Sequence, residues 1–365
     1  MSEAKQPAKS VGTNSRAGQV WLSVVVIGRN EAERLPALFA SLSGGSDAVV
    51  EWIFVDSASS DKSAEIAGRL GAKVYRIAES SVYGPGTGRY VGTLEATGRW
   101  ILYLDGDMVL RPEFLTLIEQ LCQVEESSGK ISKALPPGTA AITGRTIDQL
   151  LDREGRVVGE RDYVTLAKQE MGPPHGWGKP ARYHGGAVLY RRESVLKAGN
   201  WNPSVYQLEE IDLLSRVLAL GGELRAVDLP MADHYTPGLS LKEKLQMNFC
   251  ASFRGKKLFG LGQVVTARFR EGGLAGFIRA YPHPFIVSAG LVTGLLLLFF
   301  SPLTALLLNL GIALWYALAK KWYYYLVYLG NVLQLLRGLG RYSRHEPVYE
   351  LLTPAGVTEN REEQD

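Results

Sequence analysis

The sequence predicts an α/β protein with a doubly wound, mostly parallel sheet, followed by an α-helical membrane region. The sheet is predicted because short apolar, β-branched runs alternate with stretches of helical spacing over roughly the first ninety ordered residues. It is also predicted because the central apolar run ends on two carboxylates, at the edge where open α/β sheets bind ligands. The membrane region is predicted because residues 285–319 contain almost no charge.

Composition narrows the class of protein. The net charge of +3 over 365 residues is too small to suggest a nucleic-acid-binding protein. Cys122 and Cys250 are too few and too far apart for a disulfide framework or a zinc site, and we expect both to be reduced in a cytoplasmic protein. Residues 1–19 are polar and lack the apolar core of a secretion signal, so we expect a disordered tail.

Three strand–helix units open the folded part of the chain. The expected strands cover residues 20–27, 49–55 and 72–77, and helical spacing follows the first two at 32–42 and 64–70. Parallel neighbours need crossover connections, which these helices supply. The order of elements therefore predicts a parallel sheet.

The glycine-rich stretch at 84–89 does not fit a dinucleotide-binding loop, which follows the first strand directly. Here the first strand ends on Gly28, Arg29 and Asn30, with only one glycine. We expect the later glycines to let a loop close over a ligand. Arg89 is then either a diphosphate contact or an ordinary surface arginine.

The central strand, residues 100–104, ends on Asp105, Gly106 and Asp107. Two carboxylates this close repel each other unless a cation lies beside them, and oxygen ligands without nearby cysteine favour Mg²⁺ or Mn²⁺. The alternative is a solvated turn. The position after a buried strand favours a metal or nucleotide site.

Further polar clusters follow a helix at 112–125, a loop at 127–137 and a strand at 140–146. Gly185 and Gly186 precede a short strand, and a helix begins near Glu209 and Glu210, where negative charge suits the helix dipole. Asp212 and Arg216 stand four apart and can pair. A helix with acidic N-terminal residues is the simpler interpretation of this segment taken alone.

Together these motifs resemble the family-2 glycosyltransferases with the GT-A fold over roughly residues 20–235. The resemblance rests on the order and spacing of the motifs Gly28-Arg29-Asn30-Glu31, Asp56, Asp105-Gly106-Asp107, Gly185-Gly186, Gly199-Asn200-Trp201 and Glu209-Glu210-Ile211-Asp212-Leu213-Leu214-Ser215-Arg216. The Gln-x-x-Arg-Trp signature of processive synthases is missing after residue 235, so we expect transfer of a single sugar.

The resemblance implies roles for individual residues. The donor-binding set is Asn30, Glu31, Asp56, Arg89 and Asp105; the acceptor loop is Gly185 and Gly186; and Asp105 and Asp107 hold Mn²⁺ or Mg²⁺, with His234 as a third ligand or else a surface or core histidine. The family's general-base Asp falls on Glu210 here, which leaves Glu209 and Asp212 as alternatives.

The membrane prediction rests on charge and length. We divide the chain into a tail at 1–19, a GT-A catalytic domain at 20–238, basic amphipathic interfacial helices at 239–284, a transmembrane hairpin with an interfacial or third helix at 285–340, and a polar tail at 341–365. The basic residues of the interfacial part are Lys242, Lys244, Arg254, Lys256, Lys257, Arg268, Arg270 and Arg279, expected to face anionic lipid. Basic residues flank both ends of the hairpin, which predicts cytoplasmic ends. A soluble hydrophobic subdomain is the alternative.

The predicted function is a metal-dependent inverting glycosyltransferase at the inner (cytoplasmic) membrane, with its catalytic domain in the cytoplasm. It moves one sugar from a UDP- or GDP-sugar to a lipid-linked acceptor, either a polyprenyl phosphate or a glycolipid; a homo-oligomer is left open. One alternative is a sugar nucleotidylyltransferase, whose glycine-rich loop follows the first strand, whereas here it comes three strands later. The other is a catalytically inactive membrane adaptor that keeps the fold.

Overall fold

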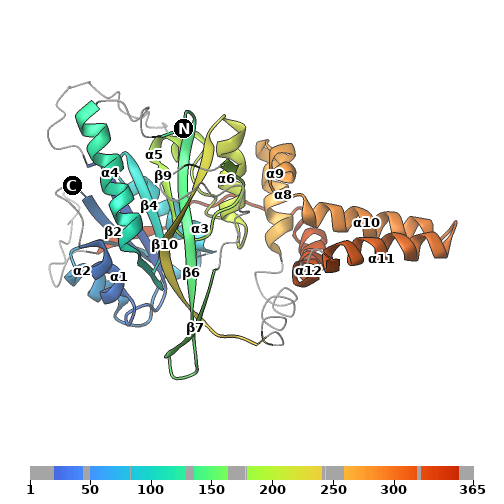
Figure 1. The fold of residues 1–365 in the computed structure, drawn as a ribbon, viewed down its shortest axis with the longest axis horizontal. Helices are drawn as coiled ribbons and strands as arrows, with labels where there is room; N and C mark the ends of the chain where they lie inside the picture. Colours follow the sequence, from blue (N-terminus) through green and yellow to red (C-terminus); the bar gives the residue numbers. More distant parts are fainter. Residues whose placement is uncertain are drawn as a thin grey trace, which may run out of the picture.

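A computed structural model describes residues 20–43, 50–82, 84–128, 135–162, 177, 179–240, 243, 259–318 and 322–352. The predicted tail at 1–19 and the basic residues at 242, 244, 254, 256 and 257 lie outside this part of the chain. The described residues form an α/β body from which a long helical hairpin projects (Figure 1).

One sheet of eleven strands runs through the body in the order β11-β3-β2-β1-β4-β9-β6-β10-β5, with β7 on β6 and β8 on β10. The strands are β1 Leu22–Gly28, β2 Val50–Asp56, β3 Lys73–Ile77, β4 Trp100–Asp105, β5 Met108–Leu110, β6 Thr139–Leu151, β7 Val157–Asp162, β8 Pro180–Ala181, β9 Val188–Arg191, β10 Glu223–Pro237 and β11 Tyr349–Leu352. Strands β3, β2, β1 and β4 are parallel, as predicted.

The second half of the sheet corrects the prediction of a mostly parallel sheet. Strands β6 and β10 are parallel to each other, but β9 is antiparallel to β4 and β6, and β5 is antiparallel to β10. The sheet is therefore mixed. The direction of short strands such as β5 and β9 could not be predicted, because no crossover helix in the sequence connects them to a neighbouring strand.

Helices cover both faces of the sheet, which is why β1 is apolar along its length. One apolar core lies between the sheet and α1 Leu35–Leu42, α2 Ser63–Arg69 and α4 Pro112–Ser128. The other lies between the sheet and α3 Pro85–Glu95, α5 Arg192–Lys197 and α6 Glu209–Ala219 (Figure 1). A short 3₁₀ turn, Glu79–Ser81, precedes α3.

The C-terminal segment was predicted to be a polar tail from residue 341, and the structure corrects this for residues 341–352. Strand β11 pairs antiparallel with β3, and the hydroxyl of Tyr349 donates a hydrogen bond of 2.7 Å to Glu95. The partner strand lies some 270 residues earlier, a separation that local composition cannot reveal.

Five further helices lie between β10 and β11 in the part of the chain that the structure describes. They are α8 Gly260–Glu271, α9 Leu274–Ala280, α10 His283–Leu297, α11 Pro302–Leu318 and α12 Trp322–Gly338. The projecting hairpin consists of α10 and α11 (Figure 1). By length and composition none of the described helices qualifies alone as a membrane span, whereas α9 and α10 qualify together across a bend of 96°.

The basic side chains of α8 only partly follow the prediction that they face lipid. Arg268 is buried, and its guanidinium forms ion pairs with Asp212 at 2.8 Å and Glu271 at 2.6 Å. Arg270 donates a hydrogen bond to the Tyr342 carbonyl oxygen at 2.8 Å. Arg268 therefore joins α8 to α6 and does not face lipid.

Candidate active site

The carboxylates of Glu31, Asp105 and Asp107 lie together at the carboxyl edge of the parallel strands. In the strand register Gly28 pairs with Asp56 and Ile27 pairs with Asp105, so the first two loops and the Asp-Gly-Asp turn lie side by side. Glu31 packs so closely on the turn that a Cβ added to Gly106 would lie 2.7 Å from its Cγ. Burial, and then the charges of Asp107 and Asp105, raise the pKa of Glu31 to about 7.

His234 reaches the same place from β10. Strand β5 follows the Asp-Gly-Asp turn directly and pairs with β10, with Met108 opposite His234. The imidazole lies with Nε2 3.4 Å from Asp107 Oδ2 and Nδ1 2.9 Å from Asp148 Oδ1. Burial opposes protonation of His234, but Asp107 and Asp148 outweigh it and raise its pKa to about 10.

These residues fit a hard divalent cation. Asp107 Oδ1 is buried and has no hydrogen-bond partner among the described residues, so one carboxylate oxygen is left for a cation. No group of three or more His, Cys, Asp or Glu side chains within the described ranges is placed to hold an ion by itself. Mg²⁺ and similar ions need fewer, because they keep waters and bind substrate phosphates alongside one or two carboxylates.

Arg89 lies beneath this cluster, only 1% exposed. Its Nη2 is 2.7 Å from Asp105, its Nη1 is 3.1 Å from Glu209 and 3.5 Å from Glu210, and its guanidinium lies over the Trp201 ring at 5.1 Å. The prediction that Arg89 could be an ordinary surface arginine is therefore wrong. The enclosed position also favours a role in holding three carboxylates over the predicted contact with a diphosphate.

The two glutamates at the start of α6 differ in exposure. The Glu210 side chain is 24% exposed and that of Glu209 is 4% exposed. Burial raises the pKa of both, and it raises that of Glu209, which also feels the Glu210 charge, to about 8. Glu210 is the one with access to a substrate.

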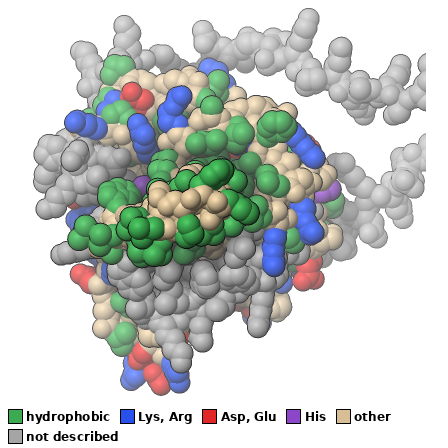
Figure 2. Space-filling view, turned by 90° about the vertical axis from the view of Figure 1, so that its right-hand side faces the viewer, with side chains coloured by type: hydrophobic (Ala, Val, Ile, Leu, Met, Phe, Trp, Pro, Cys, Tyr) green, Lys and Arg blue, Asp and Glu red, His purple; other side chains and the backbone are tan. Residues whose placement is uncertain are grey.

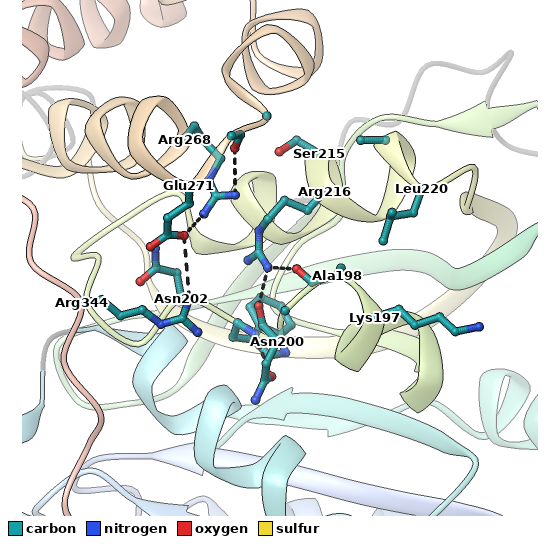
Figure 3. A pocket seen from close by; sticks show the side chains of 15 residues that line it. Lys197, Ala198, Asn200, Asn202, Ser215, Arg216, Leu220, Arg268, Glu271 and Arg344 are labelled. Carbon is teal, nitrogen blue, oxygen red and sulfur yellow. Dashed lines mark hydrogen bonds and ion pairs between the residues drawn. The ribbon is translucent and has the colours of Figure 1, made fainter. Parts of the chain in front are cut away.

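Asp212 is turned to a different set of partners. It is fully buried and forms ion pairs of 2.8 Å with both Arg216 and Arg268. These arginines also line a cavity of about 440 Å³ beside Glu271 and Arg344 (Figure 3). Both oxygens of Asp212 are held by arginines out of contact with solvent, so no oxygen is left to approach an acceptor and the geometry disfavours Asp212 as the base.

Asn30 and Asp56 connect the loops after β1 and β2. Asn30 has a left-handed backbone with a φ of 62°, and its side-chain oxygen accepts a hydrogen bond of 2.8 Å from the Ser60 amide. Asp56 is buried and accepts hydrogen bonds from Arg76 at 2.7 Å and from the Ser59 amide at 3.1 Å. The roles predicted for both residues in donor binding stay predictions.

The Gly185-Gly186 loop lies directly against the carboxylates. A Cβ added to Gly186 would overlap Asp105 Oδ2, so only glycine fits here without displacing that side chain. Sequence analysis missed His184, whose ring lies 2.7 Å from the Gly185 carbonyl oxygen and 3.0 Å from the Tyr190 hydroxyl. Burial lowers the pKa of His184 to about 4, so the ring is neutral.

Comparison with known proteins finds similarity to the family that the sequence motifs resemble. Residues 23–128 match the family model described as Glycosyl transferase family 2. This segment is thus similar to that family.

Two curated relatives support the match. The chain is 27% identical over 197 residues to 4,4'-diaponeurosporenoate glycosyltransferase of Staphylococcus haemolyticus, an alignment that covers 53% of this chain and 50% of that protein. It is 24% identical over 197 residues to an uncharacterized glycosyltransferase of Haemophilus influenzae, covering 54% of this chain and 62% of the relative. The chain thus spans only about half to three-fifths of the length of these relatives.

The fold also has a solved counterpart. A mannosyltransferase from Pyrobaculum calidifontis, in complex with GDP-Man and Mn²⁺, superposes with a TM-score of 0.52 at 15% identity. The superposition covers 88% of this chain and 87% of that one. At this level of identity the similarity concerns the fold.

Proposed function

We propose that this protein is a metal-dependent inverting glycosyltransferase that moves one sugar from a UDP- or GDP-sugar to a lipid-linked acceptor. The observation that carries the proposal is that the buried Arg89 joins Asp105, at the start of the Asp-Gly-Asp turn, to Glu210 at the start of α6. The family match over residues 23–128 supports a nucleotide-sugar donor. The GDP-Man and Mn²⁺ bound by the mannosyltransferase of similar fold agree with it.

Asp107 and His234 would hold Mn²⁺ or Mg²⁺, with Asp105 and Glu31 adding negative charge beside them. When bound, such an ion neutralises the charge that develops on the departing nucleoside diphosphate. The loops carrying Asn30 and Asp56 would bind the nucleotide.

Glu210 would act as the general base. An acceptor oxygen forms a bond to the anomeric carbon as the bond from that carbon to the diphosphate oxygen breaks, and the acceptor proton passes to the Glu210 carboxylate. Attack from the face opposite the leaving group inverts the configuration. Burial raises the pKa of Glu210 while the nearby Arg89 lowers it, so the balance between them sets how strongly it attracts the proton.

Release of nucleoside diphosphate from a panel of UDP- and GDP-sugars, with Mn²⁺ or Mg²⁺ and a membrane lipid extract, tests the proposal. Glu210→Gln is expected to lose nearly all transfer and to keep donor binding, since the amide preserves shape but cannot accept the proton. The exposed Glu193→Gln, on α5, is the matched control and should keep full activity. Full activity in Glu210→Gln would show that Glu210 is not the general base. Donor binding without turnover in the unmodified protein would favour the inactive adaptor.

The acceptor class rests on the helical hairpin. Its apolar side chains are exposed, including Phe299 at 84% and Phe300 at 86%. Figure 2, which looks onto the end of the hairpin, shows a patch of apolar side chains there. An apolar surface of this kind fits a bilayer better than water. We therefore include in the proposal that the hairpin inserts into the cytoplasmic membrane from the side of the catalytic domain, which brings lipid-linked acceptors to the site.

Binding to vesicles of phosphatidylcholine and phosphatidylglycerol tests this part. Burying a phenylalanine side chain contributes roughly 1.5–3 kcal/mol, so replacing Phe299 and Phe300 by Ser should weaken vesicle binding by about a hundredfold or more. Phe269→Ser removes a phenylalanine that is 76% exposed on α8, outside the hairpin, and should have little effect. Equal loss in both variants would contradict insertion through the hairpin.

A further inference from the structure

Asp148 is a buried carboxylate to which the mechanism above gives no role. It lies on β6 opposite His234 of β10 in the strand register, and its side chain is out of contact with solvent. One carboxylate oxygen lies 2.9 Å from His234 Nδ1, and the other forms an ion pair with Arg161 of β7. Both oxygens of Asp148 are thus occupied, one by a ring nitrogen and one by a guanidinium.

This arrangement selects one tautomer of His234. A carboxylate paired with an arginine can only accept hydrogen bonds, so Nδ1 must carry a proton. The proton that a divalent cation would replace is therefore the one on Nε2, the nitrogen 3.4 Å from Asp107 Oδ2. Nε2 and Asp107 present two donor atoms to the same small space, next to the Asp107 oxygen that has no hydrogen-bond partner among the described residues.

We propose that Asp148 is a positioning residue that fixes the ring of His234 so that Nε2 and Asp107 bind one divalent cation together. This inference rests on the proposed metal-dependent function. Carboxylates that hold the far nitrogen of a metal-binding histidine orient the ring and raise its basicity, and losing one typically costs 10- to 100-fold in metal affinity. The competing interpretation is a purely structural chain of ion pairs from Asp107 to Arg161.

Mn²⁺ binding to the full chain separates the two interpretations, with free Mn²⁺ measured by electron paramagnetic resonance. Asp148→Asn keeps the shape of the side chain and removes its charge, and it should weaken Mn²⁺ binding by about 10- to 100-fold. The control is Asp162→Asn on β7, a carboxylate with a 54% exposed side chain that pairs with Arg145. The control should bind Mn²⁺ like the unmodified protein.

A double substitution shows whether Asp148 acts through His234. His234→Ala should weaken Mn²⁺ binding at least as much as Asp148→Asn, and adding Asp148→Asn to it should cost nothing more. A structural role would instead give independent, additive losses. Unchanged Mn²⁺ affinity in Asp148→Asn, or additive losses in the double variant, would overturn the inference.

Two further measurements keep the test decisive. If Asp148→Asn does not fold by circular dichroism, Arg161→Gln replaces it, because Arg161 is partly exposed and holds the second carboxylate oxygen of Asp148, so that its loss lets this carboxylate turn away from His234. Arg161→Gln should then lower Mn²⁺ affinity several-fold, and an unchanged affinity would overturn the inference. Mn²⁺ binding in the unmodified protein that does not depend on Asp107 would count against the proposed function itself.

Discussion

Removal of Arg89 gives the sharpest test of how the acidic site is held together. Arg89→Met keeps much of the side-chain volume and leaves Asp105, Glu209 and Glu210 without their shared cation. Deleting one partner of a buried ion pair costs about 3–5 kcal/mol, because the remaining charge stays buried without compensation. Arg89 is enclosed, so solvent screening gives no reason to discount this figure. We expect a loss of about 3–5 kcal/mol in the free energy of unfolding at pH 8.

The loss should depend on pH in a definite direction. Burial, together with the Glu210 charge, raises the pKa of Glu209 to about 8, above the value of 4.5 for a free side chain. The folded state therefore holds a proton that the unfolded state has lost, and stability falls as pH rises from about 4.5 to about 8. Without Arg89 the carboxylates bind protons more tightly, so the fall steepens and the defect is smaller at pH 5.5 than at pH 8.

Urea unfolding followed by tryptophan fluorescence at both pH values measures this effect. Arg29→Gln removes an exposed arginine whose pair with Glu79 at 3.4 Å should contribute less than about 1 kcal/mol, and it serves as the control. Adding Glu209→Gln to Arg89→Met should restore part of the loss, since one of the uncompensated charges is gone. A defect below about 1 kcal/mol at pH 8, or a larger defect at pH 5.5, would refute the reasoning.

Three further predictions concern other parts of the fold. Burial opposes ionisation of Glu51, but hydrogen bonds from Ser23, Thr97 and Lys73 outweigh it and lower its pKa, so its stabilising effect is present above pH 4.5 and lost as pH falls. Glu51→Gln should lower the free energy of unfolding at pH 7 by about 1–3 kcal/mol, and by less at pH 3.5; the melting temperature at the two pH values measures the effect. Gly186→Ala displaces Asp105 and should reduce sugar transfer by about a hundredfold with little change in melting temperature. The control Gly159→Ala, whose added Cβ meets only Leu150 at 3.8 Å, should be active, and equal activities of the two variants would contradict the role of the loop. The added Cβ of Gly92→Ala would overlap Val25 where α3 packs on β1, so this variant should lose about 1–3 kcal/mol in the free energy of unfolding measured in urea. Gly68→Ala on the more open α2 should leave stability unchanged, and an unchanged stability of Gly92→Ala would contradict the close packing.

Local pattern was enough to predict the first half of the sheet. Strands β1 and β4 are buried along almost their whole length and are apolar runs, and the polar residues that follow them lie at one edge because the strands are parallel. The family resemblance put Glu31 and Asp105 in one donor-binding set, and the structure brings both side chains close to Asp107; the roles of these residues stay predictions.

The support beneath the site was not predictable in the same way. Asp148 and His234 are 86 residues apart and meet only because two long strands pair in one register. Arg89 sits in a glycine-rich helix start that resembles a surface loop, and only the tertiary structure shows that it is enclosed by acids from β4 and α6. Partners so far apart in the chain leave no periodic signal.

Helix α6 shows that part of the assignment was available from spacing alone. Asp212 and Arg216 stand four apart and pair on one face as predicted, so Asp212 was already committed to a partner before the structure was known. What spacing does not show is that Arg268 of α8 completes this pair and that β11 returns to the sheet. The boundary predicted at residue 238 stays a prediction, but a chain cut there would lose both contacts and leave Asp212 with one of its two arginines. Helix α6 is thus held by α8, which precedes the hairpin in the chain, and this argues that α8 and the described α/β body fold together.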